Sequence, residues 1–150
     1  MQTILVCGSH SLTAEERIWA ERSVDETLRE EAIGHGTEIN IFHGGAYGVD
    51  QIAARVAHTL QVVSICEFPA QWHLWGKRAG FIRNSRMIDM LLNHKKAGHD
   101  VLVLAFFPKG VVTPGTAHTV AVAQRHNIPV RIVSPRGVLP SSPDPLTAAN

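Results

Sequence analysis

The sequence predicts an α/β fold in which a mostly parallel sheet carries helices on both faces. Short apolar runs alternate with helical patterns five times along the chain, which favours parallel strands joined by right-handed crossovers. The runs TILVC (residues 3–7) and DVLVLAF (residues 100–106) are apolar throughout, as is typical of strands covered on both faces. We therefore expect a Rossmann-like arrangement of three layers, with five strands in the order 3-2-1-4-5.

The first half of the chain is expected to supply three strands and two helices. Thr13 and Glu16 form a capping box, T-A-E-E, that opens a polar helix reaching to about Ile33, where two glycines end it. The second helix is amphipathic, because its apolar residues fall at helical spacing between positions 49 and 60. The strands of this half are expected at residues 3–7, 38–42 and 62–66.

The second half begins with an irregular aromatic stretch, EFPAQWHLWGKRAG, at residues 67–80. Beyond it we expect helices at residues 81–93 and 117–126, and strands at residues 100–106 and 129–133. The tail from Ser134 contains four prolines and little to bury, which is typical of a flexible or surface-laid segment. The chain is thus expected to form one domain, residues 1–134, followed by a flexible Pro/Ser-rich tail, residues 135–150.

Length and composition fit a single globular domain with its own core. The chain has 150 residues, of which 45% are hydrophobic and 18% charged. The formal net charge of +1 gives no overall attraction to nucleic acid or to an anionic membrane. No apolar run is long enough to span a membrane, and the start, MQTILVCGS, lacks the features of a signal peptide. We therefore expect a cytoplasmic protein.

Cysteine and histidine usage does not indicate a metal site. Cys7 and Cys66 each end an apolar run, which favours two buried, reduced thiols over a catalytic thiolate or a disulfide. The nine histidines are scattered, with no H-x-x-x-H pair beside a third ligand, and no C-x-x-C is present. We expect no bound metal, and His43 and His118 are the histidines best placed for function because both lie in loops.

Three loops follow the carboxyl ends of strands and lead into helices, at residues 8–10, 43–48 and 108–116. Each is rich in glycine or small hydroxyl residues, so backbone N–H groups can approach a ligand, and each helix N-terminus attracts an anion. His43 stands where the dinucleotide fingerprint has its first glycine, and no P-loop lysine follows, so the nucleotide is not specified. The loop residues expected to bind a ligand are Gly8, Ser9, His10, His43, Gly44, Gly45, Gly48, Gly115 and Thr116.

Charged and amide side chains near these loops are further candidates for ligand binding. Arg83 and Asn84 are expected at the start of a helix, where the guanidinium suits a phosphate, and Lys77 adds charge nearby. Asp50 lies in the first turn of its helix, where it either fastens the loop or accepts a hydrogen bond from a ribose hydroxyl.

Taken together, these motifs resemble the YspA-type branch of the SLOG superfamily of Rossmann-like nucleotide-binding proteins. The motifs are HGGAYGVD at residues 43–50, GKRAGFIRNSRM at residues 76–87 and GTAH at residues 115–118, within a match covering nearly all of residues 3–133. The resemblance implies a SLOG-type domain that binds a nucleotide or nucleotide-derived ligand, such as AMP, ADP-ribose or an NAD-like molecule. It also implies a homodimer, and no separate cofactor is expected.

The chain is also similar to the LOG phosphoribohydrolases, which release a base from a nucleoside monophosphate. Their pattern has an arginine four residues before a methionine, matched by Arg83 and Met87, and a glutamate in G-T-x-E, where this chain has His118. A carboxylate can stabilise an oxocarbenium-like transition state, whereas a neutral or protonated histidine cannot. The candidate catalytic residues are therefore Arg83, His118 and Asp50, and whether the chain is an enzyme stays open.

Three functions are consistent with these residues. The first, which we favour, is the binding or sensing of a nucleotide without robust catalysis. The second is LOG-like cleavage of an N-glycosidic bond. The third, not favoured because of the near-neutral charge, is single-stranded nucleic-acid binding like that of the related DprA proteins, through Arg78, Arg83 and Arg86. Trp72 and Trp75 would then stack on bases, although a hydrophobic plug or a dimer contact is the preferred interpretation of these tryptophans.

Overall fold

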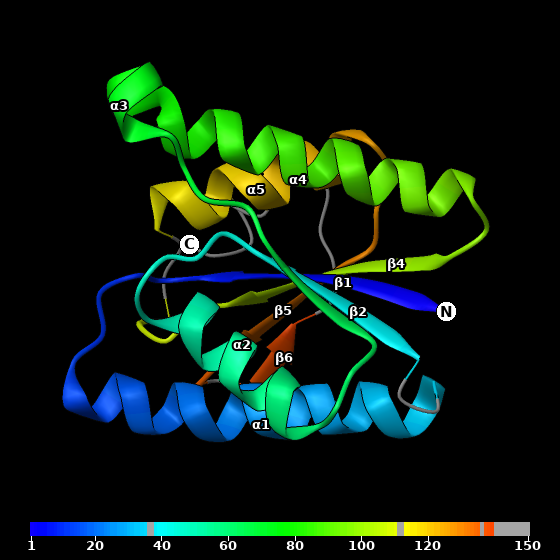
Figure 1. The fold of residues 1–150 in the computed structure, drawn as a ribbon. Helices are drawn as coiled ribbons and strands as arrows, with labels where there is room; N and C mark the ends of the chain where they lie inside the picture. Colours follow the sequence, from blue (N-terminus) through cyan, green and yellow to red (C-terminus); the bar gives the residue numbers. More distant parts are fainter. Residues whose placement is uncertain (36–37, 111–112, 136, 140–150) are drawn as a thin grey trace.

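The computed structural model describes residues 1–35, 38–110, 113–135 and 137–139, and they form three layers (Figure 1). The central sheet has the order β3-β2-β1-β4-β5-β6, and its first five strands are parallel. The predicted α/β fold and strand order 3-2-1-4-5 are therefore confirmed. The elements are β1 Gln2–Gly8, α1 Ala14–His35, β2 Ile39–His43, α2 Val49–Thr59, β3 Ser64–Glu67, α3 Trp72–Trp75, the 3-10 helix η1 Gly76–Arg78, α4 Ala79–Lys96, β4 Asp100–Phe106, α5 Pro114–Arg125, β5 Val130–Ser134 and β6 Gly137–Leu139.

Strand β1 lies in the interior of the sheet, between β2 and β4. It pairs with β4 from Gln2 opposite Asp100 to Gly8 opposite Phe106, and with β2 on its other side. The chain leaves β1 toward β2 on one side and leaves β4 toward β5 on the other, so the loops diverge at the carboxyl ends of β1 and β4. Crevices of this kind are where open α/β sheets bind ligands.

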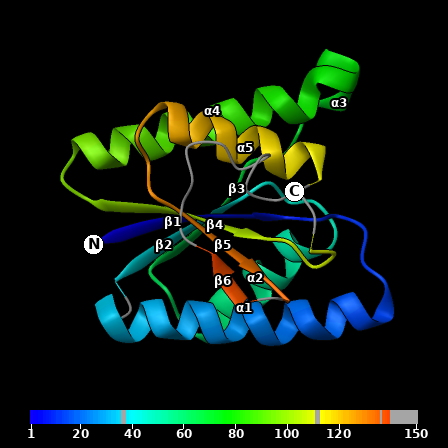
Figure 2. The same cartoon turned by 180° about the vertical axis from the view of Figure 1, so that it is seen from behind.

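Helices α1 and α2 cover one face of the sheet, and α4 and α5 cover the other (Figures 1 and 2). Each face has its own apolar core. On the α1/α2 side, Ile4 and Val6 of β1 pack among buried residues such as Ile41 and Ile52. On the α4/α5 side, Leu5 and Cys7 of the same strand belong to the second cluster. The alternation of β1 side chains between two buried faces explains why its sequence is apolar throughout.

The start of α1 has the predicted capping box. The Thr13 N–H donates to Glu16 Oε1 at 2.9 Å, and the Glu16 N–H donates to Thr13 Oγ1 at 3.2 Å. These two bonds satisfy amides that a helix N-terminus would otherwise leave without a partner.

The structure corrects several sequence expectations. Cys66 is exposed rather than buried, because β3 is an edge strand whose four residues are all exposed. The aromatic stretch contains α3 and η1, and α4 begins at Ala79, so Arg83 and Asn84 lie in its second turn rather than at its start. Helix α5 begins at Pro114, which suits the first turn because proline has no N–H to leave unsatisfied.

The beginning of the expected tail contributes a strand. Residues Gly137–Leu139 form β6, which pairs antiparallel with β5 and was not predicted. Residues 140–150 lie outside the described part, so the boundary at residue 134 and the flexibility of the tail stay predictions. None of the helices in the described ranges is long and apolar enough to cross a membrane.

Candidate functional site

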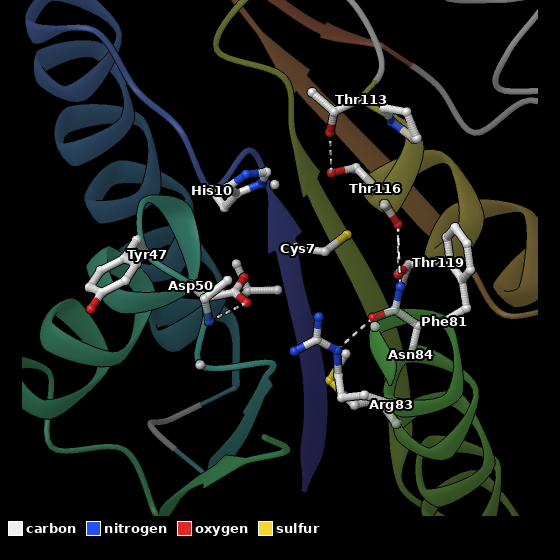
Figure 3. A pocket seen from close by; sticks show the side chains of 18 of the residues that line it. Cys7, His10, Tyr47, Asp50, Phe81, Arg83, Asn84, Thr113, Thr116 and Thr119 are labelled. Carbon is white, nitrogen blue, oxygen red and sulfur yellow. Dashed lines mark hydrogen bonds between the residues drawn. The ribbon is translucent and has the colours of Figure 1, made fainter. Parts of the chain in front are cut away.

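A pocket of about 590 Å³ opens at the carboxyl end of β1, and the β2–α2 loop, α4 and the first turn of α5 contribute to its lining. Its size falls within the range of small-molecule sites. Figure 3 shows Asp50 on the α2 side and the threonines of α5 on the other, with Cys7 and the Arg83 guanidinium between them.

Most of the residues predicted to bind a ligand line this pocket. Those that do are Gly8, His10, Gly45, Asp50, Lys77, Arg83, Asn84, Gly115 and Thr116. Ser9, His43, Gly44 and Gly48 are not among its lining residues. They support the wall instead: Ser9 Oγ donates to the Ser11 carbonyl at 3.0 Å, and the Ser9 carbonyl accepts from the Val49 N–H at 3.1 Å.

The loop between β2 and α2 satisfies its amides internally. Asp50 Oδ2 accepts from the Gly44 N–H at 3.1 Å and from the Ala46 N–H at 3.3 Å. Between them, the Gly45 N–H donates to His43 Nδ1 at 3.0 Å. Asp50 therefore fastens the loop, which is one of the two roles that the sequence left open.

Burial shifts the pKa values of both side chains that hold this loop. Asp50 is 7% exposed, and burial raises its pKa from 3.8 to about 6, opposed by the loop amides and by Arg83. Burial lowers the pKa of His43, which favours the neutral ring whose Nδ1 accepts from Gly45. The loop is thus held by a carboxylate that changes charge near pH 6.

Arg83 and Asn84 link the two walls of the pocket. Arg83 Nη1 donates to the carbonyls of Gly44 at 2.5 Å and of Phe68 at 3.4 Å, and its Nε donates to Asn84 Oδ1 at 2.8 Å. Asn84 Nδ2 in turn donates to the Gly115 carbonyl at 3.4 Å, in the first turn of α5. Two of the three guanidinium nitrogens are therefore engaged by the protein, and Nη2 donates to no other described residue, which leaves its N–H groups for a ligand.

The N-terminal turn of α5 forms the far wall. Thr113, Pro114, Gly115 and Thr116 line the pocket there, and Thr113 Oγ1 donates to Thr116 Oγ1 at 3.0 Å. Thr119, one turn further along, donates to the Gly115 carbonyl at 3.3 Å. This turn combines a helix N-terminus with several hydroxyl groups, both of which suit a phosphate.

Exposed aromatic side chains surround the pocket. Tyr47, Trp72 and Phe81 all line it and are 76%, 59% and 46% exposed. The second tryptophan, Trp75, is exposed but does not belong to the lining. Trp72 is therefore better placed than Trp75 to stack on a ligand.

His118 does not line the pocket. Its ring packs against Phe81 with 4.6 Å between centroids, and its Nδ1 has no hydrogen-bond partner among the described residues. Burial lowers its pKa. Of the three candidate catalytic residues, the structure brings together Asp50 and Arg83 only.

Several lining residues were not predicted. Tyr47 lies inside the glycine loop itself, and Thr119 follows Thr116 at the helical spacing of three, so both carried a readable signal. Nothing in the sequence marked Phe81 and Cys7 as pocket residues, because their apolar surroundings indicated core packing. Cys7 lies at the base of the pocket with its pKa raised well above the usual range, chiefly by burial, so it is no reactive thiolate. Among the described residues no cluster of metal-ligating side chains is present.

No model of a known protein family matches the chain. The gene 61 protein of Mycobacterium phage D29 is 33% identical to it over 135 residues, covering 87% of this chain and 94% of the phage protein. The chain belongs to the gene 61 protein family. This member also resembles a solved structure, DNA processing protein A from Helicobacter pylori, whose report describes a single-stranded DNA binding mode. The TM-score is 0.51 at 18% identity, and the match covers 87% of this chain but only 64% of the other, so the likeness shows a shared fold.

Proposed function

We propose that this pocket binds a phosphorylated nucleoside, in keeping with the YspA-type branch that the motifs resemble. The proposal rests on one observation: groups suited to a phosphate, to a sugar hydroxyl and to a base line the same pocket. Arg83, Lys77 and the first turn of α5 suit an anion, Asp50 suits a hydroxyl donor, and exposed aromatic rings suit a base.

The pocket favours binding over cleavage of an N-glycosidic bond. Asp50 is the one carboxylate that lines it within the described residues, and both of its hydrogen bonds are spent on the loop. His118, which stands in place of the LOG glutamate, packs on Phe81 outside the lining. A LOG-like reaction would therefore have only Asp50 as its carboxylate among the described lining residues, and one oxygen of Asp50 already holds the loop amides.

Calorimetric titration with AMP, ADP-ribose and NAD tests the proposal, with adenosine as the unphosphorylated control. Each sample is then chromatographed for released base. Binding of a phosphorylated ligand in preference to adenosine, without released base, supports a binding module. Released base would establish a hydrolase instead, and no binding of any nucleotide would overturn the proposal.

Single-stranded nucleic acid is a second candidate, favoured by the charge beside the pocket. Residues 76–96 contain six basic residues against one acidic residue, Asp89, a net charge of +5. Within the described part, every ion pair engages an acidic residue of α1, and the exposed Lys77, Arg78 and Arg86 have no such partner. Exposed Trp72 lies at the same end, and cations interleaved with aromatic rings are typical of single-strand binding. DNA processing protein A, whose reported ligand is single-stranded DNA, shares the fold.

A further inference from the structure

We infer that the Asp50 carboxylate occupies the anion-binding position formed by the Gly44 and Ala46 amides of the β2–α2 loop, here called the anion seat. A ligand would then point hydrogen-bond donors at this side of the pocket and place its anionic group near Arg83 and the first turn of α5. The inference rests on the proposed function, because it assigns an orientation and a selectivity to a nucleotide-type ligand. It makes Asp50 a specificity-determining residue rather than a catalytic one.

The β2–α2 loop has the geometry of an anion-binding site. Successive backbone amides in a turn ordinarily form a concave binding site for a ligand anion. Here the amides of Gly44 and Ala46 converge on one oxygen of Asp50, at 3.1 and 3.3 Å, and the amide between them is taken by His43. The loop amides thus form an anion-binding site, and the Asp50 carboxylate of the same chain occupies it.

Charged groups from neighbouring elements surround this seat. Asp50 interacts with Arg83 from α4, with Glu67 from β3 and with the Cys7 thiol from β1, while His43 of β2 holds the same loop. Arg83 is the one cation in this set, and Glu67 is a second acid. A ligand phosphate placed here would face two carboxylates and would find the loop amides already taken. The opposite wall has Lys77 and the α5 N-terminus, and no acidic residue among the described lining.

Asp50 has an oxygen that can accept a hydrogen bond from a ligand. Both of its hydrogen bonds use Oδ2, so Oδ1 is the oxygen with capacity for a ligand donor. Sugar hydroxyl groups supply such donors, whereas a second phosphate does not. The pocket should therefore prefer a nucleoside with a single phosphate-bearing end over a ligand such as ADP-ribose, whose pyrophosphate and second ribose extend the molecule.

Titration with inorganic phosphate, followed by amide NMR, tests the filled seat without requiring any nucleotide to bind. In the wild type at pH 7.5, phosphate should move the Gly115 and Thr116 amides and leave those of Gly44 and Ala46 in place. In Asp50→Ala the two loop amides should also respond, while Asp89→Ala, which removes an exposed carboxylate of α4, should behave as the wild type. Loop amides that respond in the wild type, or that stay silent in a folded Asp50→Ala variant, would overturn the inference.

Selectivity is tested with AMP, 2′,3′-dideoxy-AMP and ADP-ribose on the wild type and on Asp50→Asn, a neutral variant of the same shape. The wild type should bind AMP at least about tenfold more tightly than either of the others. Asp50→Asn should reduce the difference in affinity between AMP and ADP-ribose. Lowering the pH of the wild type below 6, where Asp50 takes up a proton, should have the same effect. Equal affinities in the wild type, or ratios unchanged by Asp50→Asn, would contradict the role of Asp50. Failure of every nucleotide to bind would instead contradict the proposed function. The phosphate titration would still test whether Asp50 fills the anion seat.

Discussion

At the scale of single residues, Gly48 shows why the glycine loop needs a residue without a side chain. Its φ is +84°, and a Cβ at this position would collide with the carbonyl oxygen of Ser9, which is held by the Val49 N–H. We expect Gly48→Ala to lower the free energy of unfolding by about 2 to 4 kcal/mol, since backbone strain and the collision add. Gly98→Ala is the matched control, because φ is +95° there and nothing lies near the added carbon. Equal losses in urea unfolding of the two variants would remove the close approach as the cause.

We expect the several N–H donors of the Arg83 guanidinium to matter as much for ligand binding and stability as its positive charge does. Arg83→Lys keeps the charge, but one ammonium cannot bond the Gly44 carbonyl and Asn84 Oδ1 together, and buried Asn84 then loses a partner. We expect AMP affinity to fall about tenfold, and the unfolding midpoint to fall as well. Arg86→Lys, an exposed change less than one turn further along α4, should leave both unchanged. Wild-type affinity in Arg83→Lys would show that charge alone suffices.

At the scale of elements, a line of polar side chains ties α4 to three strands and should make stability depend on pH. Ser64 Oγ donates to Asn40 Oδ1 at 2.6 Å, Asn40 Nδ2 donates to Thr3 Oγ1 at 3.3 Å, and Thr3 Oγ1 shares a 2.8 Å hydrogen bond with His94 Nδ1. Burial, and then the neighbouring His99, lower the pKa of His94. The folded state therefore binds a proton less readily than the unfolded state does.

It follows that this contribution to stability is present at pH 7.5 and is lost as the pH falls below about 6.5. Asp50 acts with the opposite sign: its raised pKa means that the folded state gains a proton as the pH falls from about 6 toward 3.8. We expect His94→Gln to flatten the decline in unfolding free energy between pH 7.5 and 5.5, and Asp50→Asn to steepen it. Urea titrations at both pH values check this, and the reverse order of slopes would refute it.

The elements also show what a sequence can and cannot predict. The extent of β4, the neighbouring positions of β1 and β4 and the capping box at Thr13 followed from apolar runs and local side-chain chemistry. The exposure of Cys66 did not, because burial on β3 depends on being at the edge of the sheet. The role of the β2–α2 loop was only half readable. Its glycines predicted a tight turn before a helix, but the sequence could not show that the Asp50 side chain turns back and accepts hydrogen bonds from the loop amides.

At the scale of the whole molecule, charge is separated between the two helical layers although the formal total is only +1. Helix α1 carries seven acidic residues, and the ion pairs that Arg55, Lys109 and Arg131 make reach this helix. The layer with η1 and α4 keeps its net charge of +5 without ion pairs in the described part. The near-neutral net charge of the whole chain is therefore a poor guide to nucleic-acid binding. A polyanion contacts one face of the protein and responds to the charge on that face.

This separation predicts which charges a single-stranded oligonucleotide would use. If it binds along η1 and α4, its affinity should fall linearly with the logarithm of salt concentration, by a slope of about −0.7 for each phosphate contacted. Changing both Arg78 and Arg86 to glutamate should weaken binding and reduce the slope by about 1.4, since two contacts are lost. Changing Arg17 and Arg22 of α1 to glutamate alters the total charge equally and places it on the other layer. Fluorescence anisotropy over a salt series measures all three proteins. Equal weakening by the two double variants would mean that net charge, and not the α4 face, governs the interaction, and the second candidate function would then lose its support.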